Sequence, residues 1–151
     1  MIEGVKITPK QQIKDDRGMV AHMLRCDDKE YLQFGEIYFS YVKPKIVKGW
    51  HLHKEMTLNY VVVHGNIRLV LFDDRKKSKT RGETMEIELD AVNSYSLVTV
   101  PPKIWNGFIG LGDSMSIVAN CATIPHDPLE IIRIDPENNE LIEYNWHKST
   151  K

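Results

Sequence analysis

Short apolar runs separated by turn residues recur along the whole chain, at a spacing of about ten residues. The runs are rich in Val, Ile, Tyr and Phe, and some alternate strictly, as Met85, Ile87 and Leu89 do with the polar residues between them. Alternation with a period of two is typical of strands whose two faces meet different surroundings. No long stretch has the apolar period of a helix. The pattern therefore predicts one all-β domain over residues 1–151, a sandwich or a barrel.

Turn residues set the limits of the expected strands. Gly65 beside Asn66 indicates a tight turn, because both residue types accept positive φ, and Pro44 and the pair Pro101-Pro102 end two other strands. The predicted strands cover residues 19–24, 34–42, 47–53, 58–63, 67–72, 84–89, 95–100, 105–111, 114–121 and 131–134, with 141–146 as a terminal strand or a helix turn.

Composition excludes several classes of protein. The net charge of −1 gives no reason to expect nucleic acid or a membrane surface as a partner. No segment reaches the roughly 18 apolar residues of a membrane span, and the first ten residues lack a signal-peptide core. Two cysteines, Cys26 and Cys121, are too few for a disulfide framework. We therefore expect a soluble, cytoplasmic protein.

Two imidazoles lie two residues apart in the stretch 48–53, which reads Lys-Gly-Trp-His-Leu-His. Side chains at i and i+2 leave an extended chain from the same face. His51 and His53 should therefore stand side by side on one wall. Paired imidazoles near neutral pH serve as metal ligands or as proton carriers.

This His-x-His pattern, followed by a hairpin glycine, resembles the cupin barrel, a double-stranded β-helix or jelly roll. In metal-binding cupins a glutamate precedes that glycine and a third histidine follows a later proline. The corresponding positions here are Leu58 and Asn106. Because a firmly held divalent metal needs three or more protein ligands, we expect no metal and no other cofactor, and the use of histidine as a proton carrier is favoured.

Several short motifs between residues 16 and 121 resemble, in order, those of the dTDP-4-dehydrorhamnose 3,5-epimerases, cupin enzymes of activated-sugar biosynthesis. The resemblance implies a nucleotide-activated sugar as the substrate. The motifs are Asp16-Arg17-Gly18, Lys48-Gly49-Trp50-His51, Gly65, residues 73–78 with Thr80 and Gly82, Val100-Pro101-Pro102 with Asn106-Gly107-Phe108, and Cys121.

The resemblance also implies roles for single residues. His51 matches the general base, which removes a hydrogen made acidic by the 4-keto group, and Lys48 would supply positive charge to the enolate. Arg17 matches an arginine that contacts the nucleotide phosphates, and Glu36 matches a substrate-binding glutamine. Asn106 replaces the histidine before Gly-Phe, and we expect it at the substrate.

The chain departs from the epimerase pattern at its acid and its orienting carboxylate. The family's proton donor, a tyrosine two residues before the cysteine, is Ala119 here, and the C-terminal aspartate that supports the base is missing. Asp127 and Glu130 could replace that aspartate, but nothing in the sequence places them. His126 is expected to be a solvated histidine.

In the same stretches the chain is similar to the dTDP-sugar 3,4-ketoisomerases, which move a proton between neighbouring carbons on one face of the sugar. That similarity adds His53 and Tyr38 as catalytic candidates, and it includes a tryptophan at the position of Trp105. This ring could stack on the substrate or belong to the core. Four functions stay open: an epimerase with His51 as base, a ketoisomerase using His51 and His53, a non-catalytic sugar-nucleotide-binding or assembly protein, and a metal-dependent cupin. Cupins of this type pair as homodimers, and residues 4–14 could add a strand to a partner's sheet.

Overall fold

The computed structural model describes residues 1–148, and the regular elements in that range are all β-strands. Ten of them lie within two five-stranded sheets and two form a separate hairpin. The strands are β1 (Lys6–Pro9), β2 (Gln12–Asp15), β3 (Gly18–Ala21), β4 (Glu36–Val42), β5 (Val47–His53), β6 (Leu58–His64), β7 (Asn66–Phe72), β8 (Thr84–Asp90), β9 (Ser96–Val100), β10 (Trp105–Gly110), β11 (Ser116–Ala122) and β12 (Ile131–Arg133).

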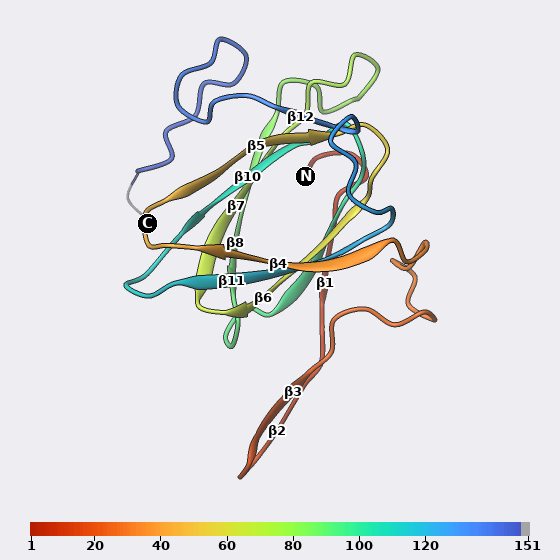
Figure 1. Ribbon diagram of the computed structural model, residues 1–151, viewed down its shortest axis with the longest axis vertical. Helices are drawn as coiled ribbons and strands as arrows, with labels where there is room; N and C mark the ends of the chain where they lie inside the picture. Colours follow the sequence, from red (N-terminus) through yellow and green to blue (C-terminus); the bar gives the residue numbers. More distant parts are fainter. Residues whose placement is uncertain (149–151) are drawn as a thin grey trace.

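The two large sheets face each other as the layers of a jelly-roll barrel (Figure 1). One has the strand order β1-β9-β6-β11-β4 and the other β12-β5-β10-β7-β8, and neighbours are antiparallel throughout. Neighbours in each sheet are often distant in sequence, which is the mark of a Greek-key connection. The all-β, cupin-type fold predicted from the sequence is confirmed.

The main core lies between the two sheets. It is built by the inward-facing residues of alternating strands, for example Leu58, Leu69, Val98, Phe108 and Val118. Each such side chain contributes about 1.5–3 kcal/mol by leaving water. Gly65 closes the β6–β7 hairpin with a φ of 71°, a conformation that favours glycine.

A second apolar cluster covers the outer face of the sheet that contains β5. Trp50, Trp105 and Val70 project outward there and pack against Ile142 and Trp146 from the C-terminal segment. Residues 141–146 form neither a strand nor a helix turn, so that prediction is wrong. The segment lies against the outer face of the sheet, where its contacts are made by side chains.

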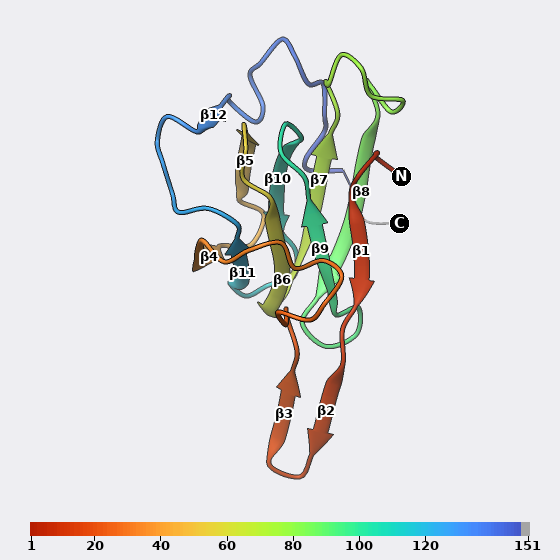
Figure 2. The same ribbon diagram turned by 90° about the vertical axis from the view of Figure 1, so that its right-hand side faces the viewer.

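The N-terminal region divides between the barrel and a projecting arm. Strand β1 pairs with β9 of its own sheet, with Lys6 opposite Thr99. Strands β2 and β3 form a two-stranded hairpin that extends away from the barrel (Figures 1 and 2). Part of the segment 4–14 is therefore already used within the chain. No helix that could cross a bilayer occurs in residues 1–148.

Candidate active site

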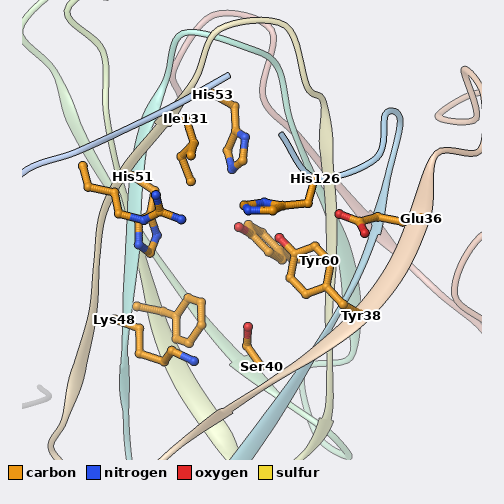
Figure 3. A pocket seen from close by; sticks show the side chains of 11 residues that line it. Glu36, Tyr38, Ser40, Lys48, His51, His53, Tyr60, His126 and Ile131 are labelled. Carbon is orange, nitrogen blue, oxygen red and sulfur yellow. The ribbon is translucent and has the colours of Figure 1, made fainter. Parts of the chain in front are cut away.

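A cavity of about 460 Å³ opens between the two sheets, on the inner side of β5 and β4. Most of its lining comes from three strands. Strand β5 supplies Lys48, His51 and His53, β12 supplies Ile131 and Arg133, and β4 supplies Glu36, Tyr38 and Ser40, while Tyr60, Phe108 and His126 complete the wall. Figure 3 shows His51 and Tyr38 on opposite sides of this space.

His51 and His53 share the inner face of β5, as the i, i+2 spacing predicted. Trp50, which precedes them, and Leu52, which lies between them, join the outer cluster. Strand β5 lies between β12 and β10. It approaches β10 closely at two glycines, because a Cβ on Gly49 would come within 2.8 Å of the Gly107 Cα. The register shifts between Asn106 and Phe108 at the same place.

The surroundings of His51 disfavour its charged form. Burial, followed by the positive charge of Arg133 and the neighbouring His53 and Lys48, lowers the pKa of His51 to about 4. At neutral pH the ring is therefore an uncharged imidazole. An uncharged imidazole can donate one hydrogen bond and accept another.

His53 is held by a carboxylate. Its Nδ1 lies 2.6 Å from Oε2 of Glu130, the residue just before β12, and both side chains are buried, at 6% and 8% exposed. The other oxygen, Oε1, accepts the backbone N–H groups of Glu55 at 2.8 Å and Met56 at 2.9 Å. Burial raises the pKa of Glu130, but these backbone hydrogen bonds and the His53 ring outweigh it, and the pKa lies below its ordinary value. Glu130 is thus an anion at neutral pH.

The wall opposite β5 carries a phenol. Tyr38 faces inward from β4, and its Oη accepts a hydrogen bond of 2.9 Å from Asn120 Nδ2 on β11. Asn120 is itself fixed, because its Oδ1 accepts the backbone N–H of Asn59 at 2.9 Å. Burial raises the pKa of Tyr38, so the phenol keeps its proton at neutral pH.

Ala119 does not face the cavity. It belongs to a cluster on the outer face of its sheet with Val61, Tyr95 and Leu97. The residue that β11 turns toward Tyr38 is Asn120. The expectation that position 119 occupies the acid's place on the inner wall is therefore wrong, and the inner wall is not without a proton donor, because Tyr38 stands there.

Glu36 and Lys48, both expected at the substrate, line the cavity. Lys48 Nζ donates to the Tyr41 carbonyl at 3.4 Å. Glu36 Oε1 is buried and has no hydrogen-bond partner within residues 1–148. A buried carboxylate oxygen without a partner is costly, so it is a place where a hydroxyl or amide of a ligand would be favourable.

Three of the expected substrate-binding residues lie outside the lining. Trp105 packs in the outer cluster and is 5% exposed. Asn106 is buried behind the cavity, where it donates to the His51 carbonyl at 3.0 Å and accepts from Tyr60 Oη at 3.2 Å. Arg17 is 85% exposed on the β2–β3 hairpin and pairs with Asp15 at 2.6 Å. Alternation in β10 turns Trp105 outward, and the projecting hairpin carries Arg17 away from its own barrel.

Sequence reasoning missed several lining residues. His126 was expected to be solvated, and it is exposed, but it also lines the cavity (Figure 3), which the sequence did not indicate. It sits in an irregular connection between β11 and β12, where no periodicity signals its direction. Arg133 shares a face with Ile131 by the period of two, so that signal existed once β12 was known to lie beside β5. Within residues 1–148, no group of three or more His, Cys, Asp or Glu is placed to hold a metal ion.

Comparison with known proteins identifies the family. The model of the dTDP-4-dehydrorhamnose 3,5-epimerase family matches residues 1–151. The chain belongs to this family. A curated member with similar sequence is the spore coat polysaccharide biosynthesis protein SpsL of Bacillus subtilis, 30% identical over 149 residues and 97% of each chain. Another is the probable low-salt glycan biosynthesis epimerase Agl13 of Haloferax volcanii, 31% identical over 128 residues, or 83% of this chain and 81% of that protein.

Solved structures of the family have the same fold. The crystal structure of a dTDP sugar isomerase from Desulfovibrio desulfuricans G20 is 40% identical, with a TM-score of 0.94 over 99% of this chain and 94% of that one. The chain is therefore a member of a family of sugar epimerases, which belong to the isomerase class.

Proposed function

We propose that this protein is an isomerase that acts on a dTDP-4-keto-6-deoxyhexose and inverts the configuration of a ring carbon next to the ketone. The observation that supports this most directly is the cavity itself, in which imidazoles of β5 face the phenol of Tyr38 across a space of about 460 Å³. Inversion at carbon needs a base on one side of the sugar and an acid on the other. Membership of the family and its dTDP-sugar chemistry support the substrate class.

The reaction follows from the residues that line the two walls. An imidazole of β5 takes the proton next to the 4-keto group, and the C–H electrons form an enolate. Lys48 and Arg133 bring positive charge to the developing oxyanion. Tyr38 then delivers a proton to the opposite face of the carbon. The resemblance to the family gives the base role to His51, and this assignment stays a prediction.

Deuterium exchange tests the proposal. We expect dTDP-4-keto-6-deoxyglucose, incubated with the protein in D₂O, to gain deuterium at C3 and C5, as followed by proton NMR. His51→Ala should slow the exchange, while His64→Ala, at the exposed end of β6, should leave it unchanged. Binding of the sugar nucleotide without exchange in the wild-type protein would contradict an enzymatic function and favour a binding protein.

The ketoisomerase alternative is supported by one observation, the pair His51 and His53 on the same wall. Two imidazoles on one face suit the transfer of a proton between neighbouring carbons without inversion. A 3-keto product with deuterium confined to C3 and C4 would favour that reaction over epimerisation.

A homodimer in the cytoplasm is the proposed working form. The outer face of the sheet containing β4 leaves large apolar side chains exposed, among them Ile37 at 50%, Phe39 at 53% and Tyr41 at 58%. Surfaces of this kind mark protein interfaces. A second copy would also give Arg17 a cavity to reach, since the hairpin carries it away from its own. Light scattering should give twice the chain mass, and Phe39→Asp should halve it.

A further inference from the structure

The two histidines of β5 have different surroundings, although they lie two residues apart. Burial, followed by the charges of Arg133, His53 and Lys48, lowers the pKa of His51 to about 4. His53 meets the anion Glu130 through a hydrogen bond of 2.6 Å. Two imidazoles with such different neighbours, cations at one and a carboxylate at the other, are suited to different steps of one reaction.

The Glu130 contact fixes which nitrogen of His53 carries the proton. The Glu130 carboxylate is an anion and can only accept, so His53 Nδ1 must donate to it. In the neutral ring the other nitrogen, Nε2, then has a free lone pair. Because His53 lines the cavity, this lone pair is available to take a proton there.

Glu130 is placed independently of His53. Its Oε1 accepts the backbone N–H groups of Glu55 and Met56, and its own carbonyl accepts the Lys54 N–H at 3.0 Å. The carboxylate therefore does not depend on the imidazole for its position. A fixed anion behind an imidazole holds the ring orientation and stabilises the imidazolium that forms on proton transfer.

The geometry points to His53, positioned by Glu130, as the general base of the proposed isomerase, with His51 as a neutral hydrogen-bond donor to the enolate oxygen. This inference rests on the proposed function and replaces the assignment that the family resemblance gives to His51. His53 Nε2 takes the proton from carbon, and the C–H electrons form the enolate. Tyr38 reprotonates the carbon from the other side. The phenolate regains a proton from solvent and the imidazolium releases one, so no reagent is consumed.

Other charged or titratable groups also face His53, and none replaces Glu130. His51 and Arg133 lie on the same side of the cavity, and His126 and Tyr38 complete the surroundings. The hydrogen bond found for His53 Nδ1 goes to none of these four groups but to Glu130. Arg133 is positive and cannot support an imidazolium, so the support must come from the carboxylate.

A Glu130→Gln variant separates this role from a purely structural one. The amide oxygen can keep the two backbone hydrogen bonds, which turns the amide nitrogen toward His53 Nδ1. That nitrogen can only donate, so the ring would have to move its proton to Nε2 and lose its lone pair in the cavity. We expect the kcat for exchange to fall about 10²–10⁴-fold with the fold retained.

A matched control exists on the surface. His147 Nε2 lies 3.0 Å from Glu137 Oε1, and both side chains are exposed, at 54% and 55%. Glu137→Gln removes a carboxylate from a histidine without touching the cavity, and the exchange rate should stay unchanged. Circular dichroism and thermal unfolding would show that both variants are folded.

Two measurements decide the inference. Nitrogen-15 NMR of the resting protein should show the Nδ1–H form of His53, and the Nε2–H form would overturn the inference without any assay. In the D₂O assay, the His53→Gln variant should exchange deuterium more slowly than the His51→Gln variant, and an equal or faster rate would overturn the inference. An exchange rate of Glu130→Gln within about threefold of the wild-type rate would overturn it too. An inactive wild type would defeat the proposed function together with the base role, whereas an active wild type with an active Glu130→Gln defeats the base role alone.

Discussion

The two walls of the cavity differ in how their functional groups are supported. The β5 wall carries imidazoles and positive charge, and its key contact, Glu130 on His53, comes from a connection more than seventy residues away in sequence. The β4 wall carries the phenol of Tyr38, held by Asn120 on the adjacent strand of the same sheet. One wall is suited to accept a proton and stabilise an anion, and the other to return a proton. The two walls should therefore be separable by mutation.

The largest effect that would sharpen this contrast is expected from Tyr38→Phe. Removing the phenol should lower product formation about 10²–10³-fold, because the opposite wall loses its proton donor. Deuterium exchange at carbon should stay within about tenfold of the wild type, since the base wall is intact. NMR of the substrate in D₂O measures both rates together.

The control for that variant is Tyr41→Phe, which removes a hydroxyl from the outward face of the same strand and keeps the apolar ring proposed for the dimer contact. It should change neither rate. Equal losses of exchange and product formation in Tyr38→Phe would mean that the two walls do not act separately.

A smaller effect is expected from Lys48→Gln on the β5 wall. Loss of this charge should reduce both exchange and product formation by about 10–100-fold, because the enolate is common to both while Arg133 remains. Steady-state kinetics should show the loss in kcat more than in KM. Lys43→Gln, on the exposed end of the β4–β5 connection, serves as the control. A loss confined to KM would assign Lys48 to binding alone.

The smallest effect concerns stability against pH. The pKa of His51 is lowered to about 4 by burial, then by Arg133, His53 and Lys48, whereas an unfolded histidine titrates near about 6.5. The folded chain therefore binds fewer protons between these values, and the free energy of unfolding falls as pH drops from about 6.5 to about 4, with no such loss above 6.5.

Between pH 7 and pH 5, the free energy of unfolding of His51→Gln should fall less than that of the wild type, by on the order of 1 kcal/mol after allowing for solvent screening. Urea unfolding at the two pH values measures it, with the exposed His64→Gln as the control. An unchanged pH dependence in His51→Gln would show that His51 is not kept neutral by its wall.

Much of the fold could be predicted because strand periodicity is a local property. The range 47–53 was predicted with the bounds of β5, and the same-face placement of His51 and His53 followed from the period of two. Trp105 and Asn106 show the limit of the method. Their motif suggested contact with substrate, but alternation in β10 turns one outward, and the core buries the other behind the cavity.

Counting residues along the motif could not identify which side chain of β11 faces the cavity. Spacing from Cys121 pointed to Ala119, whereas the structure turns Asn120 inward. A shift of one residue exchanges the two faces of a strand, so a motif count alone cannot decide which side chain reaches a cavity.

The sequence alone was enough to place most strands of the two large sheets and the shared face of His51 and His53, because these depend on the chain's own period of two. The tertiary structure alone decided that Glu130 supports His53 and not His51, that His126 reaches the cavity and that Arg17 points away from it. The physical reason is distance along the chain. Such contacts depend on where connections and hairpins are held by the packed sheets, and no local pattern records that.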